Sequence, residues 1–164
     1  MRFTWILLFL LGLLSACHKE SADPALLFGQ NSGCKDFSLK TELSDGPTSD
    51  CLYYSYFDNT LIIKHVNVGF NCCPEGFKVE LQVLGDTLVI RERENSNLCD
   101  CSCLFDLEYS LTDVEKKTWW IRVDEEYVGE DMEPMFFEID LKNDPEGKWC
   151  VERTHYPWGD YYNQ

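Results

Sequence analysis

The sequence predicts an all-β protein, an antiparallel β-sandwich or partly open barrel of about eight short strands. Three observations lead to this fold class. From residue 51 onward, short runs rich in β-branched and aromatic residues alternate with turn residues. Two pairs of neighbouring runs match each other as β-hairpins, with apolar residues gathered on one face. No long segment carries the apolar period of an amphipathic helix.

The first predicted hairpin joins the runs CLYYSYF and TLIIKHVNV, within residues 51–68, through the two-residue turn Asp58-Asn59. Asparagine and aspartate tolerate the backbone conformation that such a tight turn needs. With this turn, Leu52 lies opposite His65, and aromatic and aliphatic residues share one side of the hairpin. We therefore expect His65 to be a partly buried core histidine.

The second predicted hairpin joins FKVELQVL and TLVIRER, within residues 77–93, through the turn Gly85-Asp86. This turn places apolar residues opposite each other on one face. On the other face, Glu80 meets Arg91 as a cross-strand pair of opposite charge. A slip of one residue would destroy both agreements, so the register is well determined.

Four later runs complete the predicted strands: LFDLEYSL (104–111), TWWIRV (118–123), MFFEIDL (135–141) and WCVERTHY (149–156). Their short lengths and the loops between them are typical of a sandwich or barrel. The chain before residue 51 has no strand rhythm, and TELSDGPTSD (41–50) is predicted to be a loop.

The N-terminus has the pattern of an export signal. Arg2 precedes an apolar run too short to span a bilayer comfortably, which is typical of a signal peptide. Residues 14–17, Leu-Ser-Ala-Cys, follow and resemble the bacterial lipobox. The resemblance covers residues 1–17 and implies that Cys17 becomes the lipidated first residue of the mature protein. We expect a signal peptide (1–16), a lipid anchor with a flexible tether (17–33) and a cysteine-rich β-domain (34–164).

The lipobox resemblance also implies a location. Two or more acyl chains, such as palmitate, hold a protein durably, because each buried CH₂ adds about 0.8 kcal/mol. We therefore expect the protein in the cell envelope, lipid-anchored to a bacterial membrane. The outer membrane is the expected one, with the domain facing the periplasm or the exterior.

The chain is strongly acidic, with 29 Asp and Glu against 14 Lys and Arg and a net charge of −15. A nucleic-acid-binding protein needs a basic surface, so nucleic acid is not an expected partner. The same charge argues against an electrostatic membrane patch. The lipid is therefore the expected contact with the membrane.

Eight cysteines follow Cys17, and an even set in an exported protein predicts a disulfide framework. The disulfide candidates are Cys34, Cys51, Cys72, Cys73, Cys99, Cys101, Cys103 and Cys150. Alternate residues of a strand lie about 6.5–7 Å apart with parallel side chains, so neighbours within CDCSC (99–103) should not pair. The second hairpin brings CC (72–73) toward CDCSC. We expect CC to bond to two members of CDCSC, and the third member to bond to Cys34, Cys51 or Cys150.

Thiolate coordination of zinc or copper stays open as the alternative. The ligand set would be Cys72, Cys73, Cys101, Cys103 and His65. Zinc needs sulfurs about 3.8 Å apart, which a curled loop can provide and an extended strand cannot. Soft Cu(I) accepts many thiolate arrangements.

The cysteine motifs carry a second resemblance. The stretches FNCCP (70–74) and CDCSCLFDLEYSL (99–111) are similar to motifs in small uncharacterised lipoproteins of Bacteroidota, over roughly residues 61–111. The resemblance implies no activity. Residues 86–88, Asp-Thr-Leu, fit a short pattern of O-glycosylation in that phylum, which makes Thr87 a candidate glycosylation site. A plain turn is the alternative.

The remaining candidates carry no catalytic motif, since the sequence has no G-x-S-x-G and no H-E-x-x-H. His155 lies near Asp160 without a specific nucleophile. The acidic segment 124–135 is predicted to be a solvated loop, with weak calcium binding as the alternative. Trp158, Tyr161 and Tyr162 either cap the fold or bind a partner. The sequence thus predicts a non-enzymatic binding or structural module without a cofactor, with a protein or a glycan as the open choice of partner.

Overall fold

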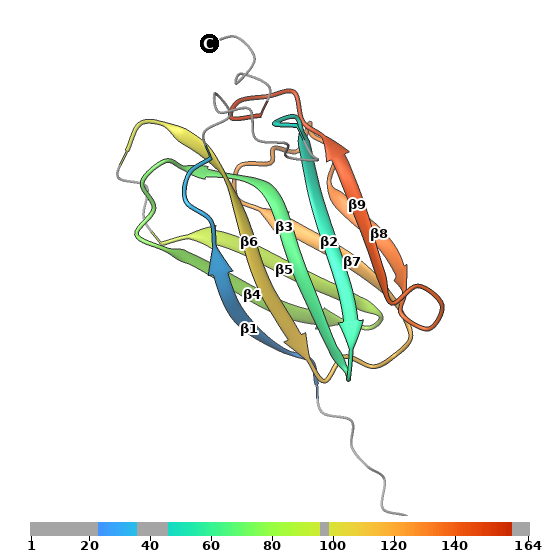
Figure 1. Ribbon diagram of the computed structural model, residues 1–164. Helices are drawn as coiled ribbons and strands as arrows, with labels where there is room; N and C mark the ends of the chain where they lie inside the picture. The colour runs from blue at the N-terminus through green and yellow to red at the C-terminus, as the bar shows by residue number, and fades with distance from the viewer. Residues whose placement is uncertain (1–22, 36–45, 96–98, 159–164) are drawn as a thin grey trace, which may run out of the picture.

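The computed structural model describes residues 23–35, 46–95 and 99–158. Within them, nine strands form two sheets packed face to face (Figure 1). The strands are β1 (Ala25–Asn31), β2 (Ser49–Phe57), β3 (Thr60–Asn71), β4 (Phe77–Leu84), β5 (Thr87–Glu94), β6 (Ser102–Thr112), β7 (Thr118–Glu125), β8 (Met135–Asp140) and β9 (Glu146–Glu152). This confirms the predicted all-β fold class. Both sheets keep open edges, so the fold is a sandwich.

The five-stranded sheet has the order β1-β6-β3-β2-β9, and the four-stranded sheet behind it in Figure 1 has the order β4-β5-β7-β8. The chain changes sheet after β3, β5, β6 and β8, so strands that are distant in sequence become neighbours. Every pair is antiparallel except β5 and β7, which run parallel. The parallel pair arises because the intervening strand, β6, belongs to the other sheet.

Both predicted hairpins form with the predicted register. In β2–β3, Leu52 pairs with His65. The two turn residues between these strands have φ values of 48° and 58°, the left-handed conformation of a tight hairpin turn. In β4–β5, Glu80 pairs with Arg91. Local turn chemistry and side-chain alternation were therefore enough to determine both pairings.

The predicted flexible tether is wrong over Ala25–Asn31, which forms β1. This strand lies at the edge of the five-stranded sheet and pairs antiparallel with β6, with Leu27 opposite Ser110. Every residue of β1 except Leu26 is exposed, so the strand lacks the apolar alternation that marks a strand in sequence. Its conformation depends on the hydrogen bonds that β6 supplies.

Two strands reach past their predicted bounds and bring acidic residues into the sheets. β2 begins at Ser49, so Asp50, predicted to lie in a loop, is a strand residue. β7 continues to Glu125, which was predicted to lie in the solvated acidic loop. Both residues are buried. Residues 41–45 of the predicted loop lie outside the described residues.

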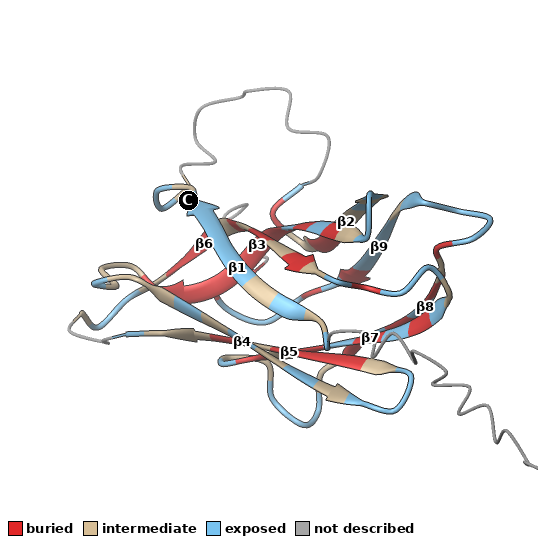
Figure 2. Ribbon diagram, turned by 90° about the horizontal axis from the view of Figure 1, so that it is seen from below, coloured by how far each residue is buried: buried red, intermediate tan, exposed pale blue. Residues whose placement is uncertain are grey.

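The core lies between the inner faces of the two sheets, where the buried residues of Figure 2 gather. It is largely aliphatic and aromatic, with Phe70 and Leu107 from the five-stranded sheet and Ile90 and Phe137 from the four-stranded sheet. Burial of such side chains contributes about 1.5–3 kcal/mol each. The apolar core is thus the main source of stability in the domain.

The end of the described chain covers the second half of β3. Trp158 is fully buried, and its indole Nε1 donates a 2.6 Å hydrogen bond to the backbone oxygen of Asn67. A Cβ at Gly69 would lie 2.7 Å from the Trp158 ring, so the strand needs glycine there for the indole to approach.

Candidate functional site

All eight cysteines from Cys34 onward form disulfides. The pairs are Cys34–Cys103, Cys51–Cys150, Cys72–Cys101 and Cys73–Cys99. The pairing agrees with the expected pattern, because no bond joins neighbours within CDCSC and each cysteine of CC bonds to one member of it. The bonds tie together segments 26 to 99 residues apart in sequence.

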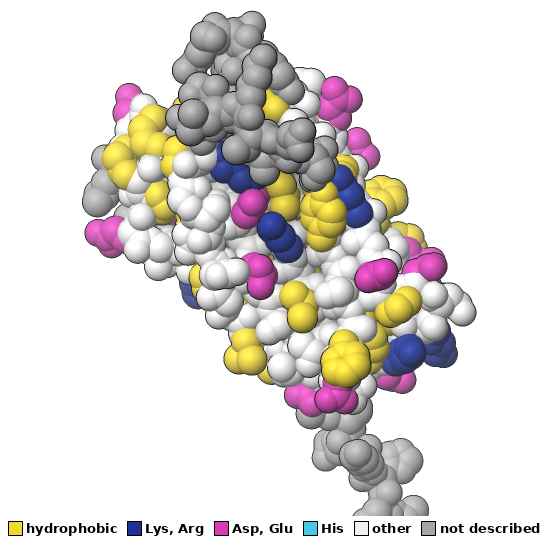
Figure 3. Space-filling view, in the orientation of Figure 1, with side chains coloured by type: hydrophobic (Ala, Val, Ile, Leu, Met, Phe, Trp, Pro, Cys, Tyr) yellow, Lys and Arg dark blue, Asp and Glu magenta, His cyan; other side chains and the backbone are white. Residues whose placement is uncertain are grey.

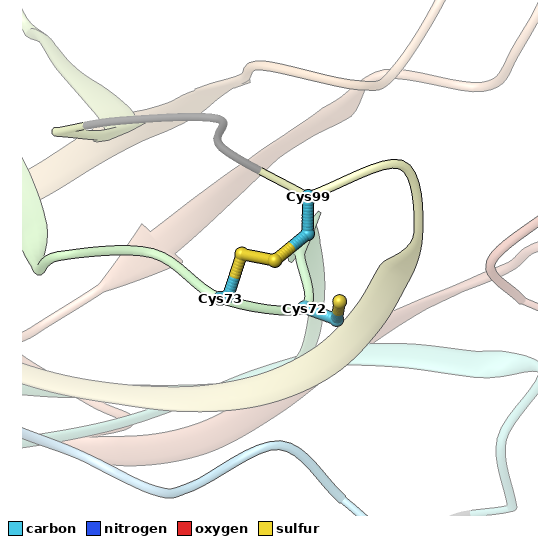
Figure 4. A group of neighbouring side chains, drawn as sticks. All are labelled: Cys72, Cys73 and Cys99. Atoms are coloured by element: carbon cyan, nitrogen blue, oxygen red, sulfur yellow. A yellow bond between two sulfur atoms is a disulfide. The ribbon is translucent and has the colours of Figure 1, made fainter.

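Two of these disulfides are neighbours at the end of the sandwich where β3 ends and β6 begins. The Sγ atoms of Cys72, Cys73 and Cys99 lie within 4.8 Å of one another (Figure 4). The β3–β6 ladder explains their approach, because the Cys72 amide donates a 2.9 Å hydrogen bond to the Cys101 carbonyl just beyond the strands. The cluster closes this end of the sandwich covalently.

The alternative thiolate metal site is not assembled by this arrangement. Its four cysteines belong to three different disulfides, and a disulfide sulfur is not the thiolate that binds a metal. His65, the fifth predicted ligand, has both ring nitrogens bonded to carboxylates instead. The structure therefore places His65 in a different site from the cysteines.

The C-terminal aromatic residues do not form the predicted binding surface at Trp158. Its ring is buried, so the capping alternative is correct for this residue. Tyr161, Tyr162 and Asp160 lie outside the described residues. His155 is exposed, and its Nδ1 lies 3.4 Å from the neighbouring Thr154 hydroxyl.

Two further predicted sites lie on the four-stranded sheet and its loops. Thr87, the candidate glycosylation site, is the first residue of β5 and is half-buried. Its modification stays a prediction. Of the acidic segment, Asp131 and Glu133 are exposed and border a small hollow of about 130 Å³, together with Glu152 and the buried Arg153.

A group of buried charged side chains lies between the two sheets, outside the sites predicted from the sequence. This charged cluster consists of Asp50 on β2, His65 on β3, Glu92 on β5, Glu125 on β7 and Arg153 just after β9. None of the five is more than 6% exposed. Burying an ion costs several kcal/mol, so the contacts within the cluster decide whether the fold tolerates it.

His65 lies between two carboxylates of the cluster. Its Nδ1 is 2.8 Å from Oε2 of Glu92, and its Nε2 is 2.7 Å from Oδ1 of Asp50. A carboxylate only accepts hydrogen bonds, so both ring nitrogens donate and the ring is an imidazolium. Burial opposes this charge, but the carboxylates of Glu92 and Asp50 outweigh it and raise the pKa of His65 well above its ordinary value. The Tyr109 hydroxyl holds Glu92 in place with a 2.9 Å hydrogen bond to Oε1.

Arg153 is the second cation of the charged cluster. Its Nε lies 2.8 Å from Oδ2 of Asp50, and its Nη2 lies 2.8 Å from Oε1 of Glu125. Its Nη1 donates to the backbone oxygen of Glu133. The other carboxylate oxygen of Glu125, Oε2, is buried and has no hydrogen-bond partner among the described residues. Burial, together with the nearby charge of Asp50, raises the pKa of Glu125 well above its ordinary value.

The signal for the charged cluster was present in the strand alternation. Glu92 continues the inward series of Leu88 and Ile90 in β5, and Glu125 continues the series that includes Val123 in β7. An acid at the end of an inward-facing series predicts a buried charge. Its partners could not be predicted, because they come from strands of the opposite sheet.

The outer face of the four-stranded sheet carries an exposed aromatic pair. The rings of Trp120 and Phe136 stack with centroids 4.9 Å apart and planes 24° apart. They are 39% and 46% exposed. Next to them is a shallow hollow of about 370 Å³, lined by Leu84, Thr87, Val89, Arg122, Pro134 and Phe136. We call Trp120 and these hollow residues the aromatic shelf.

The register of the sheet explains how the aromatic shelf forms. Trp120 pairs with Thr87 across β5–β7, and Phe136 pairs with Arg122 across β7–β8. The outer face of the five-stranded sheet differs in character, because Figure 3 shows hydrophobic, basic and acidic side chains interspersed there. An exposed stacked pair beside a hollow is the more distinctive candidate for binding.

Comparisons of the chain with protein-family models, curated proteins and solved structures find no match. The fold and the cysteines define a class on their own: a disulfide-stapled β-sandwich domain. In residues 23–35, 46–95 and 99–158 no helix has the length and apolar character needed to cross a membrane.

Proposed function

We propose that the protein is a lipid-anchored module of a bacterial cell envelope that binds a neutral glycan chain on the aromatic shelf. The observation that carries this proposal is the stacked and exposed Trp120–Phe136 pair beside a hollow. The module is non-enzymatic in this proposal, since binding on an open sheet face needs no catalytic group.

The cysteine chemistry supports the lipid anchor. The four disulfides use every cysteine from Cys34 onward, so the sulfur of Cys17 is available for the thioether that the lipobox implies. Disulfides persist in oxidising compartments, which include the bacterial periplasm and cell surface. Export and lipidation at Cys17 therefore fit the chemistry of the folded domain.

The shape and chemistry of the aromatic shelf favour a glycan chain. An aromatic ring offers a flat apolar face on which the apolar face of a sugar ring can stack. Thr87 and Arg122 supply hydrogen-bonding groups at the same place for sugar hydroxyls. Sites for small molecules usually enclose most of the ligand, whereas this hollow is shallow and suits a chain that lies across the sheet. The net charge of −15 repels acidic polymers, so the favoured glycan is neutral.

Truncation of the stacked pair tests the binding site. Soluble β-glucan and dextran serve as probes in isothermal titration of the full-length chain. We expect Trp120→Ala to weaken binding by about tenfold or more, since the loss of one buried ring contact exceeds about 1.4 kcal/mol. The matched control is Trp149→Ala, because Trp149 is also exposed and also stacks on a phenylalanine, Phe137, at 5.3 Å. Equal binding by the Trp120 and Trp149 variants, or no binding of either glucan by the unchanged protein, contradicts the proposal.

Replacement of Cys17 tests the anchor separately. We expect Cys17→Ser to abolish acylation, measured by incorporation of a labelled fatty acid, and to move the protein from the membrane to the soluble envelope fraction. Glucan binding should be unaffected, because the aromatic shelf lies in the folded domain. Continued acylation and membrane retention of this variant would show that the lipobox interpretation is wrong.

A further inference from the structure

Three members of the charged cluster are arranged as metal ligands. One side-chain atom of each of Asp50, His65 and Glu125 lies within 4.8 Å of one atom of each of the others. Nitrogen and oxygen ligands of tetrahedral zinc lie about 2.0–2.1 Å from the ion, and so about 3.4 Å from one another. The three groups therefore need to move by only about an ångström to share one ion.

Arg153 bonds to only one oxygen of the Asp50 carboxylate and one oxygen of the Glu125 carboxylate, which leaves the other two for such an ion. It bonds to Oδ2 of Asp50 and to Oε1 of Glu125. The remaining oxygens are Oδ1 of Asp50, which faces Nε2 of His65, and Oε2 of Glu125, which is buried without a partner. A buried carboxylate oxygen without a hydrogen bond is costly, and a metal ion would satisfy it.

Nδ1 of His65 has the carboxylate partner that metal-binding histidines usually have at the ring nitrogen that does not bind the metal. It bonds to Glu92 at 2.8 Å, and Glu92 is itself held by the Tyr109 hydroxyl at 2.9 Å. A carboxylate at one ring nitrogen fixes the orientation of the ring and makes the other nitrogen a better ligand. The pair Glu92 and Tyr109 would therefore keep Nε2 directed at the ion.

The charges of the cluster also fit a divalent ion. The site holds three carboxylates, those of Asp50, Glu92 and Glu125, and one guanidinium, that of Arg153. A divalent cation and a neutral His65 bring the buried group to electrical neutrality, as a low-dielectric core requires. Entry of the ion displaces the proton from Nε2, which leaves to solvent.

On these grounds we propose that the charged cluster binds one zinc ion through Asp50, His65 and Glu125. One imidazole and two carboxylates form a ligand set that zinc accepts, and three protein ligands leave a fourth position open. The acidic hollow of Asp131, Glu133 and Glu152 is the route of entry, because Arg153 borders both the hollow and the cluster. This inference is independent of glycan binding on the aromatic shelf.

Zinc binding by the full-length chain, exported so that its disulfides form, tests the site. We expect one zinc per chain by elemental analysis after dialysis. We also expect the thermal midpoint to rise by more than about 5 °C at a zinc concentration of about 100 times the Kd. X-ray absorption should report nitrogen and oxygen ligands at about 2.0–2.1 Å, including imidazole. A metal-free protein overturns the proposal, and so does a sulfur shell at about 2.3 Å, which would place the metal on the cysteines.

Two variants locate the ion. Glu125→Gln removes one ligand charge with almost no change of shape, and we expect it to lower zinc affinity at least about tenfold. Glu138→Gln removes an exposed acid on the outer face of β8, outside both the cluster and the hollow, and should bind one zinc with little change in affinity. Unchanged affinity in the Glu125 variant overturns the proposal, because the ion would then lie elsewhere. Near-ultraviolet circular dichroism shows whether that variant folds. If it does not fold, the X-ray absorption spectrum of the unchanged protein decides whether the zinc ligands are nitrogen and oxygen or sulfur.

Discussion

Arg153 and Glu125 form an ion pair in the core, with Nη2 and Oε1 2.8 Å apart and both side chains about 1% exposed. Arg153 follows β9 of the five-stranded sheet, and Glu125 ends β7 of the four-stranded sheet, so the pair joins the two layers of the sandwich. The same guanidinium lies 2.8 Å from a carboxylate oxygen of Asp50. Two buried carboxylates therefore depend on one cation.

Removal of that cation should be strongly destabilising. We expect Arg153→Met, which keeps most of the side-chain volume, to lower the free energy of unfolding by about 3–5 kcal/mol, because it leaves buried carboxylates without a partner. Urea unfolding at pH 7 measures the change. The control is Arg122→Met on the exposed outer face, where we expect a change within about 0.5 kcal/mol. Similar losses in the two variants would mean that the ion pair does not hold the sheets together.

The stability of the metal-free protein should fall as the pH rises. The pKa of His65 is raised above 6.5 and that of Glu125 above 4.5, so the folded protein holds protons that the unfolded chain releases. The contribution of each group is fully present below its unfolded pKa and is lost as the pH rises through its folded pKa. We therefore expect the free energy of unfolding to decrease from about pH 5 to pH 9, measured by urea unfolding with a metal chelator present.

Comparison with Glu125→Gln isolates the contribution of Glu125 to the pH dependence of the free energy of unfolding. Glutamine resembles the protonated acid in shape but does not titrate, so the variant lacks the loss of stability that begins above pH 4.5. We expect its stability curve to be flatter, with the largest gain over the unchanged protein at alkaline pH. Parallel curves for the two proteins would show that the pKa of Glu125 is not raised in the folded state.

The disulfides should differ in their contribution according to the length of chain that each one closes. Cys51 and Cys150 are 99 residues apart, whereas Cys73 and Cys99 are 26 residues apart. Chain entropy then predicts a loss of up to about 4.7 kcal/mol when the first bond is removed by double substitution with alanine. The loss should be smaller for the second bond, because Cys72–Cys101 still closes nearly the same loop. Urea unfolding of the two variants tests this order. A larger loss for the shorter loop would mean that packing around the sulfurs outweighs chain entropy.

Gly69 should not tolerate a larger side chain. A Cβ there would lie 2.7 Å from the Trp158 ring and 3.0 Å from a carbon of Pro157, so Gly69→Ala must displace the segment that covers β3. We expect a loss of about 1–3 kcal/mol in the free energy of unfolding, as for other overpacked sites. Gly33→Ala is the control, because a Cβ at Gly33 would meet no atom within 4 Å. Equal stability of the two variants would show that Trp158 does not need the glycine.

The features that the sequence determined by itself are local ones. The hairpin registers, such as Leu52 opposite His65, follow from a two-residue turn and from alternation along one strand. The spacing of the cysteines in CDCSC was also decisive. Alternate positions of a strand cannot bond to each other, so each of these cysteines needs a partner elsewhere in the chain. The spacing excluded bonds within CDCSC, and the register of the second hairpin directed Cys72 and Cys73 to partners there, where both bonds form.

Only the tertiary structure decided which side chains meet across the sandwich. The strand β1 exists because the edge of β6 supplies its hydrogen bonds, and its own sequence lacks an apolar alternation. The charged cluster exists because changes of sheet along the chain bring Asp50 and His65 opposite Glu92 and Glu125. A local pattern specifies which face of a strand is buried, but not which strand of the other sheet packs against it. The partners of a buried charge are therefore a property of the folded chain.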